Sequence, residues 1–332
     1  NSILLIHFVE LLSCAVRNTN CQLCLLTVNM REGFISKIKL VTIVFSIGFI
    51  SCREMVTDEF PVYDAVPVVN CILVQASFLS VNLSFFGGID SLPLPFVDNA
   101  KIMLYYNGEQ REQLKYEGEG NYSSTSIVEP GSVYLCKVII PGYDTIVCSQ
   151  TLPEATQVIG VEPMGLAGYD EEGFGYHGIK FSFPNSVLEA KYYEVSIKSL
   201  SFSEEGIMFH INQMATCDDP VILNEGVSIP LFSNEIITDS VYTMTLYYYP
   251  QSTTEWIEGD PQTTFLPVVV ELRSVTHDYY SYQKQYCLYN NGLASDGLWG
   301  KGISIPLFSN IENGYGIFAG YSVAFSDTII PK

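Results

Sequence analysis

The chain has 332 residues, with 16 Lys and Arg against 36 Asp and Glu, so its formal net charge is −20 at pH 7. This charge argues against nucleic acid as a partner, because phosphate binding needs a positive surface. The length allows one or two domains with their own cores, and the abundance of Tyr (22) and Phe (19) is typical of β-strands.

Residues 30–52 have the three-part order of a bacterial lipoprotein signal. Charged residues open the segment, an apolar run covers 40–50, and the small Ser51 precedes Cys52. The run is 11 residues long, too short to cross about 30 Å of hydrocarbon at about 1.5 Å per residue. We therefore predict a signal peptide over 30–51 and lipidation of Cys52, which would anchor the protein to a membrane. An ordinary signal peptide followed by a chance cysteine is the alternative.

The residues on either side of this signal have simpler interpretations. Residues 1–29 contain three cysteines among apolar residues, and we interpret them as upstream sequence joined wrongly to the reading frame. The alternative is a hydrophobic hairpin formed with the apolar run of the signal. The polar, acidic stretch 52–65 is expected to be a tether between the lipid and the first folded segment.

Short apolar or alternating runs, bounded by Gly, Pro, Asn and Asp, predict strands from residue 66 onward. Asn107 and Gly108 lie between two such runs and predict a tight hairpin, because both turn positions require a positive φ. Together these runs predict an immunoglobulin-like or fibronectin-like β-sandwich over 66–151. The expected strands cover 68–83, 100–106, 133–140 and 145–150.

The cysteines after Cys52 show no C-x-x-C spacing, which argues against zinc ribbons and thioredoxin-like chemistry. Cys136 and Cys148 flank a Pro-Gly turn at 141–142. A three-residue loop would place them directly across from each other, and a two-residue loop would place them on opposite faces, so their pairing stays open. We favour buried thiols. The five cysteines are Cys71, Cys136, Cys148, Cys217 and Cys287.

Residues 152–156 are expected to form a linker to a second β-rich, sandwich-like domain over 157–332. One helix is predicted near 276–290, where tyrosines recur at offsets 0, 3, 7 and 10 and Ser274 or Thr276 can serve as N-cap. A tyrosine face can be a ligand platform, but packing against a sheet is favoured. The expected strands cover 178–183, 192–199, 206–211, 241–249 and 266–272. The tyrosines are Tyr279, Tyr282, Tyr286 and Tyr289.

The chain repeats one short segment. Residues 226–234 read GVSIPLFSN, and residues 302–310 read GISIPLFSN, 76 positions later. A proline inside each copy favours a sheet edge or a strand end. We expect the two copies to occupy matching places and to bury Phe232 and Phe308.

Several longer motifs distinguish the chain, and they are PGSVY at 130–134, FSFP at 181–184, KYYEV at 191–195, VTHDYYSY at 275–282 and IPLFSNIENGYGIFAGY at 305–321. Together they resemble the domain-of-unknown-function 4249 family, lipoproteins of Bacteroidetes-type bacteria. The resemblance covers about 66–331 and is most specific over 310–321. It implies an immunoglobulin-like first domain, a β-rich second domain, and outer-membrane residence, often beside TonB-dependent transport proteins. It implies no catalytic residue, because the family has no established activity.

No catalytic or metal-binding motif was found, so we expect neither an enzyme nor a cofactor or metal. None of the three histidines after Cys52 has metal-ligand spacing. Ser281 and Lys284 match S-x-x-K, but the companion motifs are missing. The acidic segments 169–172 and 217–219 are interpreted as solvated loops rather than Ca²⁺ sites. A pair of glycosidase carboxylates stays open, because its spacing is spatial. The histidines are His177, His210 and His277.

We therefore expect a lipid-anchored outer-membrane binding or accessory protein, associated with a TonB-dependent uptake complex and facing the periplasm or the cell surface. Its candidate binding residues are Tyr247, Tyr248 and Tyr249 of the second domain, since exposed tyrosines suit recognition. In a strand these rings alternate faces, so Tyr248 should point away from the other two. The alternatives are a surface hydrolase acting on glycans or peptides, and a structural adhesin or pilus-like subunit.

Overall fold

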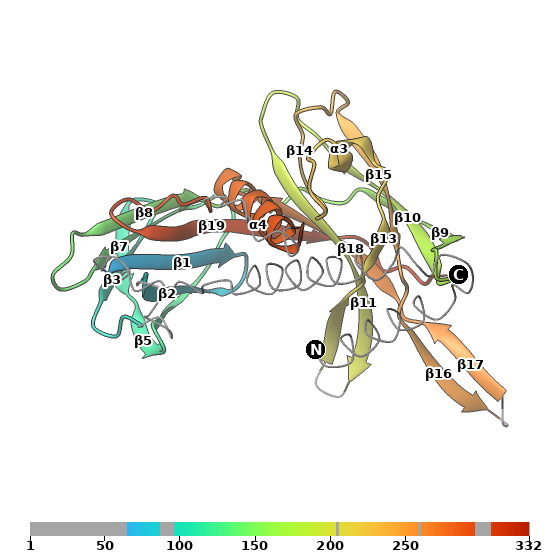
Figure 1. The fold of residues 1–332 in the computed structure, drawn as a ribbon, viewed down its shortest axis with the longest axis horizontal. Helices are drawn as coiled ribbons and strands as arrows, with labels where there is room; N and C mark the ends of the chain where they lie inside the picture. Colours follow the sequence, from blue (N-terminus) through green and yellow to red (C-terminus); the bar gives the residue numbers. More distant parts are fainter. Residues whose placement is uncertain (1–64, 87–95, 204–205, 258–259, 296–306, 332) are drawn as a thin grey trace, which may run out of the picture. The chain divides into compact units, whose positions relative to one another are not determined.

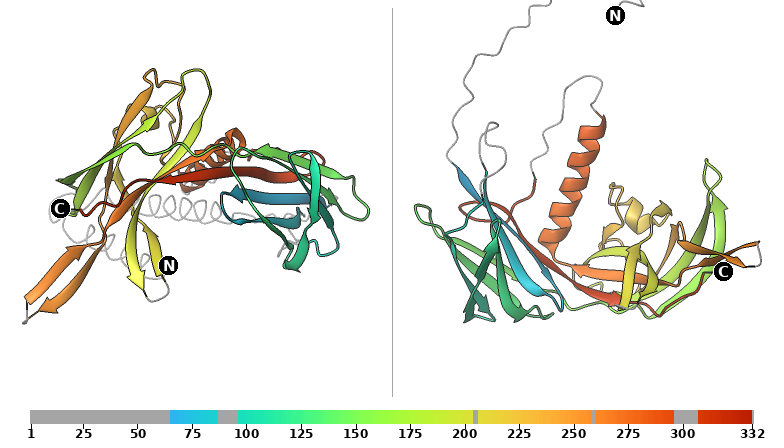
Figure 2. Two further views of the ribbon diagram at one scale, coloured as in Figure 1. Left: turned by 180° about the vertical axis from the view of Figure 1, so that it is seen from behind. Right: turned by 90° about the horizontal axis from the view of Figure 1, so that it is seen from below.

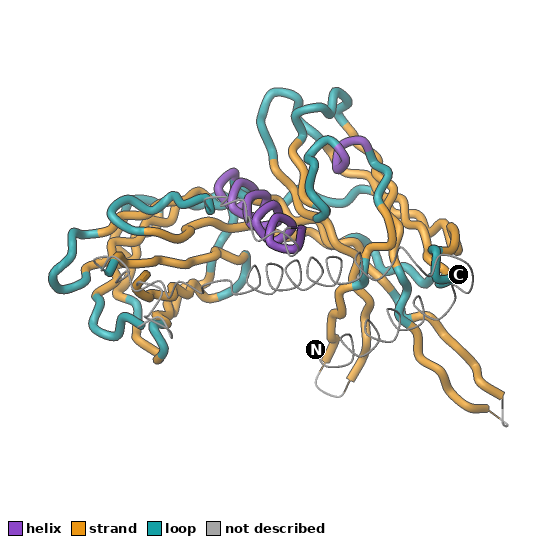
Figure 3. The backbone as a smooth tube through the Cα atoms, viewed as in Figure 1, coloured by secondary structure: helices purple, strands orange, loops and turns teal. Residues whose placement is uncertain are grey.

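The computed structural model describes residues 65–86, 96–203, 206–257, 260–295 and 307–331 (Figure 1). Cys52, the predicted signal peptide and residues 1–29 lie outside the described residues, as does nearly all of the predicted tether, so these interpretations stay predictions. The described residues belong to one compact unit, Phe60–Lys332. They are mainly strands with two helices (Figure 3), which confirms the expected fold class.

A nine-stranded sheet runs through most of the described chain, in the order β12-β11-β18-β19-β1-β2-β6-β5, with β14 paired to β11. The last strand, β19, pairs in parallel with β1 and antiparallel with β18, so the end of the chain joins its two parts (Figure 2). The strands are β1 (Val66–Val74), β2 (Phe78–Phe86), β5 (Lys115–Gly118), β6 (Asn121–Ile127), β11 (Tyr192–Ser203), β12 (Gly206–Ile211), β14 (Leu231–Ser233), β18 (Val268–Val275) and β19 (Tyr315–Phe325).

The N-terminal part, residues 66–151, adds a second sheet in the order β4-β3-β7-β8. Its strands are β3 (Lys101–Tyr106), β4 (Glu109–Gln113), β7 (Val133–Ile139) and β8 (Ile146–Thr151). The predicted hairpin is confirmed, with φ values of 49° at Asn107 and 88° at Gly108. Side chains of both sheets form one apolar cluster, the first core, which also contains Phe318 of β19. This arrangement is sandwich-like, as expected.

The C-terminal part, residues 157–331, has a four-stranded sheet in the order β13-β15-β10-β9 and a separate β16–β17 hairpin, which projects from the other sheets in Figure 1. Its second core contains Phe181, Phe183, Tyr193 and Phe232, whose rings pack against one another. The strands are β9 (Gly160–Tyr169), β10 (Gly175–Pro184), β13 (Met214–Thr216), β15 (Val241–Tyr248), β16 (Ser252–Ile257) and β17 (Asp260–Phe265).

The division into domains at 66–151 and 157–332 stays a prediction. Each part has its own core, but the nine-stranded sheet continues from one part into the other. A third, smaller apolar cluster lies on β18, β19 and the helix α4 (His277–Ser295), and includes Val275, Tyr279 and Ile317. The two parts therefore share hydrogen bonds and apolar contacts along β19.

Helix α4 is the helix expected near 276–290, and Thr276 is its N-cap, since its Oγ1 accepts a hydrogen bond from Tyr279 N at 3.2 Å. Tyr279 is buried and Tyr286 is 43% exposed, so the tyrosine face packs on the sheet mainly at the start of the helix. The only other described helix is the short α3 (Pro220–Leu223). Neither described helix is long and apolar enough to cross a membrane.

The two copies of the repeated segment differ in burial. Residues 302–306 of the second copy lie outside the described residues. Phe232 is fully buried in the second core, and Phe308 packs against the third cluster and is buried to a smaller degree, so both rings are largely buried, as expected. The difference arises because β14 covers the first copy's Leu231–Ser233 and pairs with β11, but residues 307–310 form no strand.

The last asparagine of each copy makes similar hydrogen bonds to the backbone. Asn234 accepts a hydrogen bond from Lys191 N at 2.8 Å, and Asn310 accepts one from Phe318 N at 2.9 Å. Asn234 also donates to the carbonyls of Ser186 and Glu189, and Asn310 donates to that of Phe318. Each amide therefore holds a separate backbone segment in place.

The described cysteines carry no disulfide. Cys136 on β7 and Cys148 on β8 are direct partners across the two strands, separated by a loop of six residues, 140–145. Both are buried in the first core with Cys71, as favoured above. Burial raises the pKa of Cys71 well above its ordinary value, so this thiol stays protonated at neutral pH.

Candidate functional site

Of the three candidate tyrosines, Tyr247 and Tyr248 end β15, and Tyr249 directly follows that strand. Tyr248 is buried in the second core, whereas Tyr247 and Tyr249 are half-buried on the opposite side, which is the alternation expected of a strand. Tyr247 packs edge-on against Tyr176 of β10, with ring centroids 5.8 Å apart. Tyr249 has a different environment, because it lines a cavity.

This cavity, the Tyr249 pocket, has a volume of about 580 Å³. That volume is within the range of small-molecule sites. Its walls come from the β9–β10 hairpin, the segment before β13, the end of β15 and the end of β17. The lining residues are Leu166, Asp170, Glu172, Phe174, Gly175, His177, Gln213, Tyr249, Pro250 and Phe265.

Asp170 shapes the rim of the Tyr249 pocket. Its Oδ1 accepts hydrogen bonds from the backbone N–H groups of Glu172 at 3.0 Å and Phe174 at 2.7 Å, which fixes the turn between β9 and β10. Its Oδ2 accepts the hydroxyl of Tyr249 at 2.7 Å. The hydroxyl of Tyr249 and these backbone donors hold the pKa of Asp170 below its ordinary value. The same hydrogen bond raises the pKa of Tyr249, so at neutral pH a carboxylate and a protonated phenol face each other.

His177 forms the buried wall of the pocket. Its side chain is 4% exposed, and its ring meets Phe265 edge-on with centroids 4.8 Å apart. The Nδ1 atom has no hydrogen-bond partner among the residues that the structure describes. Burial lowers the pKa of His177, so the imidazole is neutral at pH 7. A buried polar atom without a partner calls for an explanation, and a bound ligand or water supplies one.

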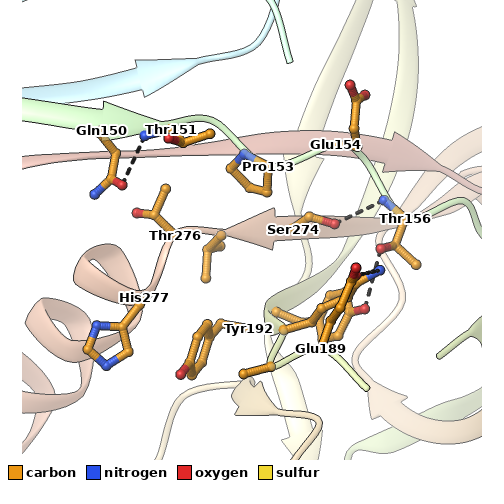
Figure 4. A pocket seen from close by; sticks show the side chains of 14 residues that line it. Gln150, Thr151, Pro153, Glu154, Thr156, Glu189, Tyr192, Ser274, Thr276 and His277 are labelled. Carbon is orange, nitrogen blue, oxygen red and sulfur yellow. Dashed lines mark hydrogen bonds and ion pairs between the residues drawn. The ribbon is translucent and has the colours of Figure 1, made fainter. Parts of the chain in front are cut away.

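A second cavity, the linker groove, lies where residues 150–156 pass the start of β11 and the start of α4 (Figure 4). Its volume is about 470 Å³. Its polar groups bond to one another: Thr156 N donates to Ser274 Oγ at 2.9 Å, and Thr156 Oγ1 lies 3.3 Å from the hydroxyl of Tyr193. These hydrogen bonds attach the linker to the second core, so we interpret the polar groups of the groove as structural.

His277 at the mouth of this groove has the neighbours of a Ser-His-Asp triad. Its Nδ1 lies 3.4 Å from Asp278 Oδ1, and its Nε2 lies 3.4 Å from Ser281 Oγ. Both distances are longer than the 2.6 to 3.2 Å of a working nucleophile and base. The other oxygen of Asp278 accepts hydrogen bonds from Asn310 at 2.7 Å and Gln150 at 2.9 Å. We interpret the set as contacts on the first turn of α4, which begins at His277.

Among the described residues, no three His, Cys, Asp or Glu side chains are grouped so that they could hold a metal ion. The acidic segment 169–172, which we interpreted as a solvated loop, is mostly exposed, and its Asp170 and Glu172 also line the Tyr249 pocket. His177 was considered only as a metal ligand. No sequence spacing connects these residues with Gln213 and Phe265, because strand pairing brings them together.

A comparison with family models shows to which protein family the chain belongs. The model of the DUF4249 family, described as a domain of unknown function, matches residues 59–326. The chain belongs to the DUF4249 family. No curated protein matches the sequence. The DUF4249 match includes every residue that lines the Tyr249 pocket and the linker groove, and it assigns a role to none of them.

Proposed function

We propose that this DUF4249 protein is a lipid-anchored outer-membrane binding protein that serves a TonB-dependent uptake complex and holds a small ligand in the Tyr249 pocket. The observation that carries the binding role is the buried imidazole of His177, which lines an open pocket of suitable size and whose Nδ1 has no partner in the described part of the chain.

The proposed location rests on the sequence. Residues 30–52 have the order of a lipoprotein signal, and lipidation of Cys52 would tether the folded part through the polar stretch that follows. The net charge of −20 gives the chain no attraction to anionic lipid headgroups, so the lipid itself would provide attachment.

The pocket's chemistry supports binding better than turnover. Its described lining contains no Ser, Thr, Cys or Lys, so the carboxylates of Asp170 and Glu172 are the candidate nucleophiles for covalent catalysis. Asp170 is hydrogen-bonded to the turn that it stabilises, and its pKa is lowered, whereas the general acid of a glycosidase needs a raised pKa. A hydrolase acting on glycans or peptides is therefore the second candidate, and the adhesin is the third.

Affinity purification from detergent-solubilised outer membranes tests the proposal. The full chain carries a C-terminal tag, and Cys52→Ala is the matched variant that cannot be lipidated. We expect wild-type protein to carry diacylglycerol on Cys52 and to recover a TonB-dependent transporter, and Cys52→Ala to leave the membrane fraction. Unlipidated wild-type protein in the soluble fraction, or rapid hydrolysis of a glycan or peptide by the pure protein, would contradict the proposal.

A further inference from the structure

We infer that the Tyr249 pocket selects organic cations, specifically an ammonium group attached to an apolar or aromatic body. This inference rests on the proposed function, because it names the ligand class of the same site. Three independent properties of the lining point to this class: its charge, its apolar walls and the free hydrogen-bonding capacity of His177.

The negative charge of the pocket lining disfavours an anionic ligand. Asp170 and Glu172 both line the pocket, and no Lys or Arg of the described segments does. The pKa of Asp170 is lowered, so its negative charge persists well below neutral pH. Around these two carboxylates the whole chain carries a net charge of −20, so the surrounding field attracts a cation and repels an anion.

The walls provide apolar contact beside this charge. Phe174 is 62% exposed and Leu166 is 51% exposed, so both offer apolar surface at the mouth of the pocket. Phe265 and Tyr249 line the pocket with further aromatic rings. Aromatic faces attract ammonium groups, most strongly when water is displaced. A ligand with an apolar body and a cationic group thus meets both kinds of surface.

His177 supplies the selective polar contact. Its neutral ring has one N–H and one lone pair, and among the described residues neither ring nitrogen has a hydrogen-bond partner; Nδ1 is enclosed. A protonated imidazole would repel an ammonium group, so the lowered pKa of His177 suits a cationic ligand. A neutral imidazole can accept a hydrogen bond from the N–H of an ammonium ligand. A carboxylate or an ether ligand has no donor for this hydrogen bond.

Three probes with the same aromatic ring and different charge test the ligand class. Binding of 2-phenylethylamine, 2-phenylethanol and phenylacetate to the purified full chain is measured by isothermal titration calorimetry at pH 7. We expect the amine to bind about tenfold more tightly than the alcohol, with the acid weakest. Equal or tighter binding of the alcohol or the acid would overturn the inference, as would absence of amine binding.

Matched variants assign the binding to the pocket. Glu172→Gln should weaken amine binding several-fold, whereas Glu162→Gln, an exposed glutamate on β9 outside the pocket, should not. His177→Phe keeps a ring against Phe265 but removes both nitrogens, so it should weaken amine binding without lowering the melting temperature. Unchanged amine binding in His177→Phe and Glu172→Gln would contradict the assignment. Recovery of the transporter is measured in a separate experiment. Failure to recover the transporter would therefore contradict the uptake role without affecting the test of the ligand class.

Discussion

The two parts of the described chain differ in how completely their buried polar groups are paired. Among described residues, four buried side-chain atoms have no hydrogen-bond partner, and all four belong to residues after 157. In the N-terminal part, by contrast, the buried hydroxyl of Tyr122 donates to Val97 O at 3.0 Å and accepts from Ala100 N at 3.1 Å. The four unpaired atoms are His177 Nδ1, Ser196 Oγ, Asn212 Nδ2 and Gln285 Oε1.

This difference indicates a division of labour. Of the four residues with unpaired atoms, only His177 lines the Tyr249 pocket, and an unpaired buried group beside an open pocket retains capacity to bind, whereas paired polar groups and a closed core suit a scaffold. The C-terminal part therefore carries the recognition that we propose, and the N-terminal part holds it through β19. Substitutions can test each side of this comparison.

The largest effect is expected at Phe318, which belongs to β19 but is fully buried in the first core. Phe318→Ala should lower the free energy of unfolding by about 3 to 5 kcal/mol. Because β19 pairs with both β1 and β18, both parts should lose stability together. Chemical denaturation followed by fluorescence measures this, with the 68% exposed Phe202→Ala as control. A loss of less than about 1 kcal/mol would contradict a stabilising role of β19 in both parts.

A smaller effect is expected at the two matching asparagines. Asn234→Ala removes an amide that donates to three acceptors and accepts from Lys191 N, and it should cost about 2 to 3 kcal/mol. Asn310→Ala removes an amide bonded to Phe318 and Asp278 and should cost about 1 to 2 kcal/mol. Melting curves of both variants compare the two losses of stability. A larger loss in Asn310→Ala than in Asn234→Ala would contradict this order.

The smallest effects are pH windows that differ between the two parts. In the N-terminal part, burial opposes the charged form of Glu112, but hydrogen bonds from Ser126, Thr125 and Ser124 outweigh it and lower the pKa to about 2 from the ordinary 4.5. Because the folded pKa is the lower one, Glu112 stabilises the protein above about pH 4.5, and this stabilisation disappears as the pH falls toward 2. Glu112→Gln should flatten that window, with Glu109→Gln as control.

In the C-terminal part the corresponding group is His177, whose folded pKa is lowered by burial from the ordinary 6.5. The unfolded chain then binds the proton more readily, so stability is complete above pH 6.5 and decreases as the pH falls through this window. His177→Phe should remove this decrease while leaving the Glu112 window intact. A stability profile unchanged between pH 7 and pH 5 in wild-type protein would contradict the burial of a neutral His177.

Local patterns in the sequence predicted much of the fold. The Asn107-Gly108 turn, most of the strand runs and the tyrosine spacing of α4 each depend on neighbouring residues, which is why these predictions were confirmed. The run expected over 68–83 was wrong in one respect, because it turns at 75–77 and forms the two paired strands β1 and β2. The joining role of β19 was missed, because its partners β1 and β18 are chosen by tertiary packing. The β16–β17 hairpin was missed too, since its exposed and largely polar strands show little apolar alternation.

The candidate site was predicted only in part. The tyrosines at 247–249 drew attention by composition, and the alternation of a strand correctly separated Tyr248 from its neighbours. Asp170, His177 and Phe265 come from three separate elements and reach Tyr249 only through the pairing of β9, β10 and β15 and the position of the β16–β17 hairpin. Only a three-dimensional structure supplies that juxtaposition.

Nitrogen-15 NMR of the histidine rings tests the central claim most directly, since it observes the proposed contact at His177 itself. At pH 7 we expect a neutral His177 whose ring signals shift when 2-phenylethylamine is added. His210, bonded to Ser201 at 2.7 Å, and His277, beside the linker groove, should not respond. An unchanged His177 signal at saturating amine, or an equal shift at His277, would contradict recognition in the Tyr249 pocket.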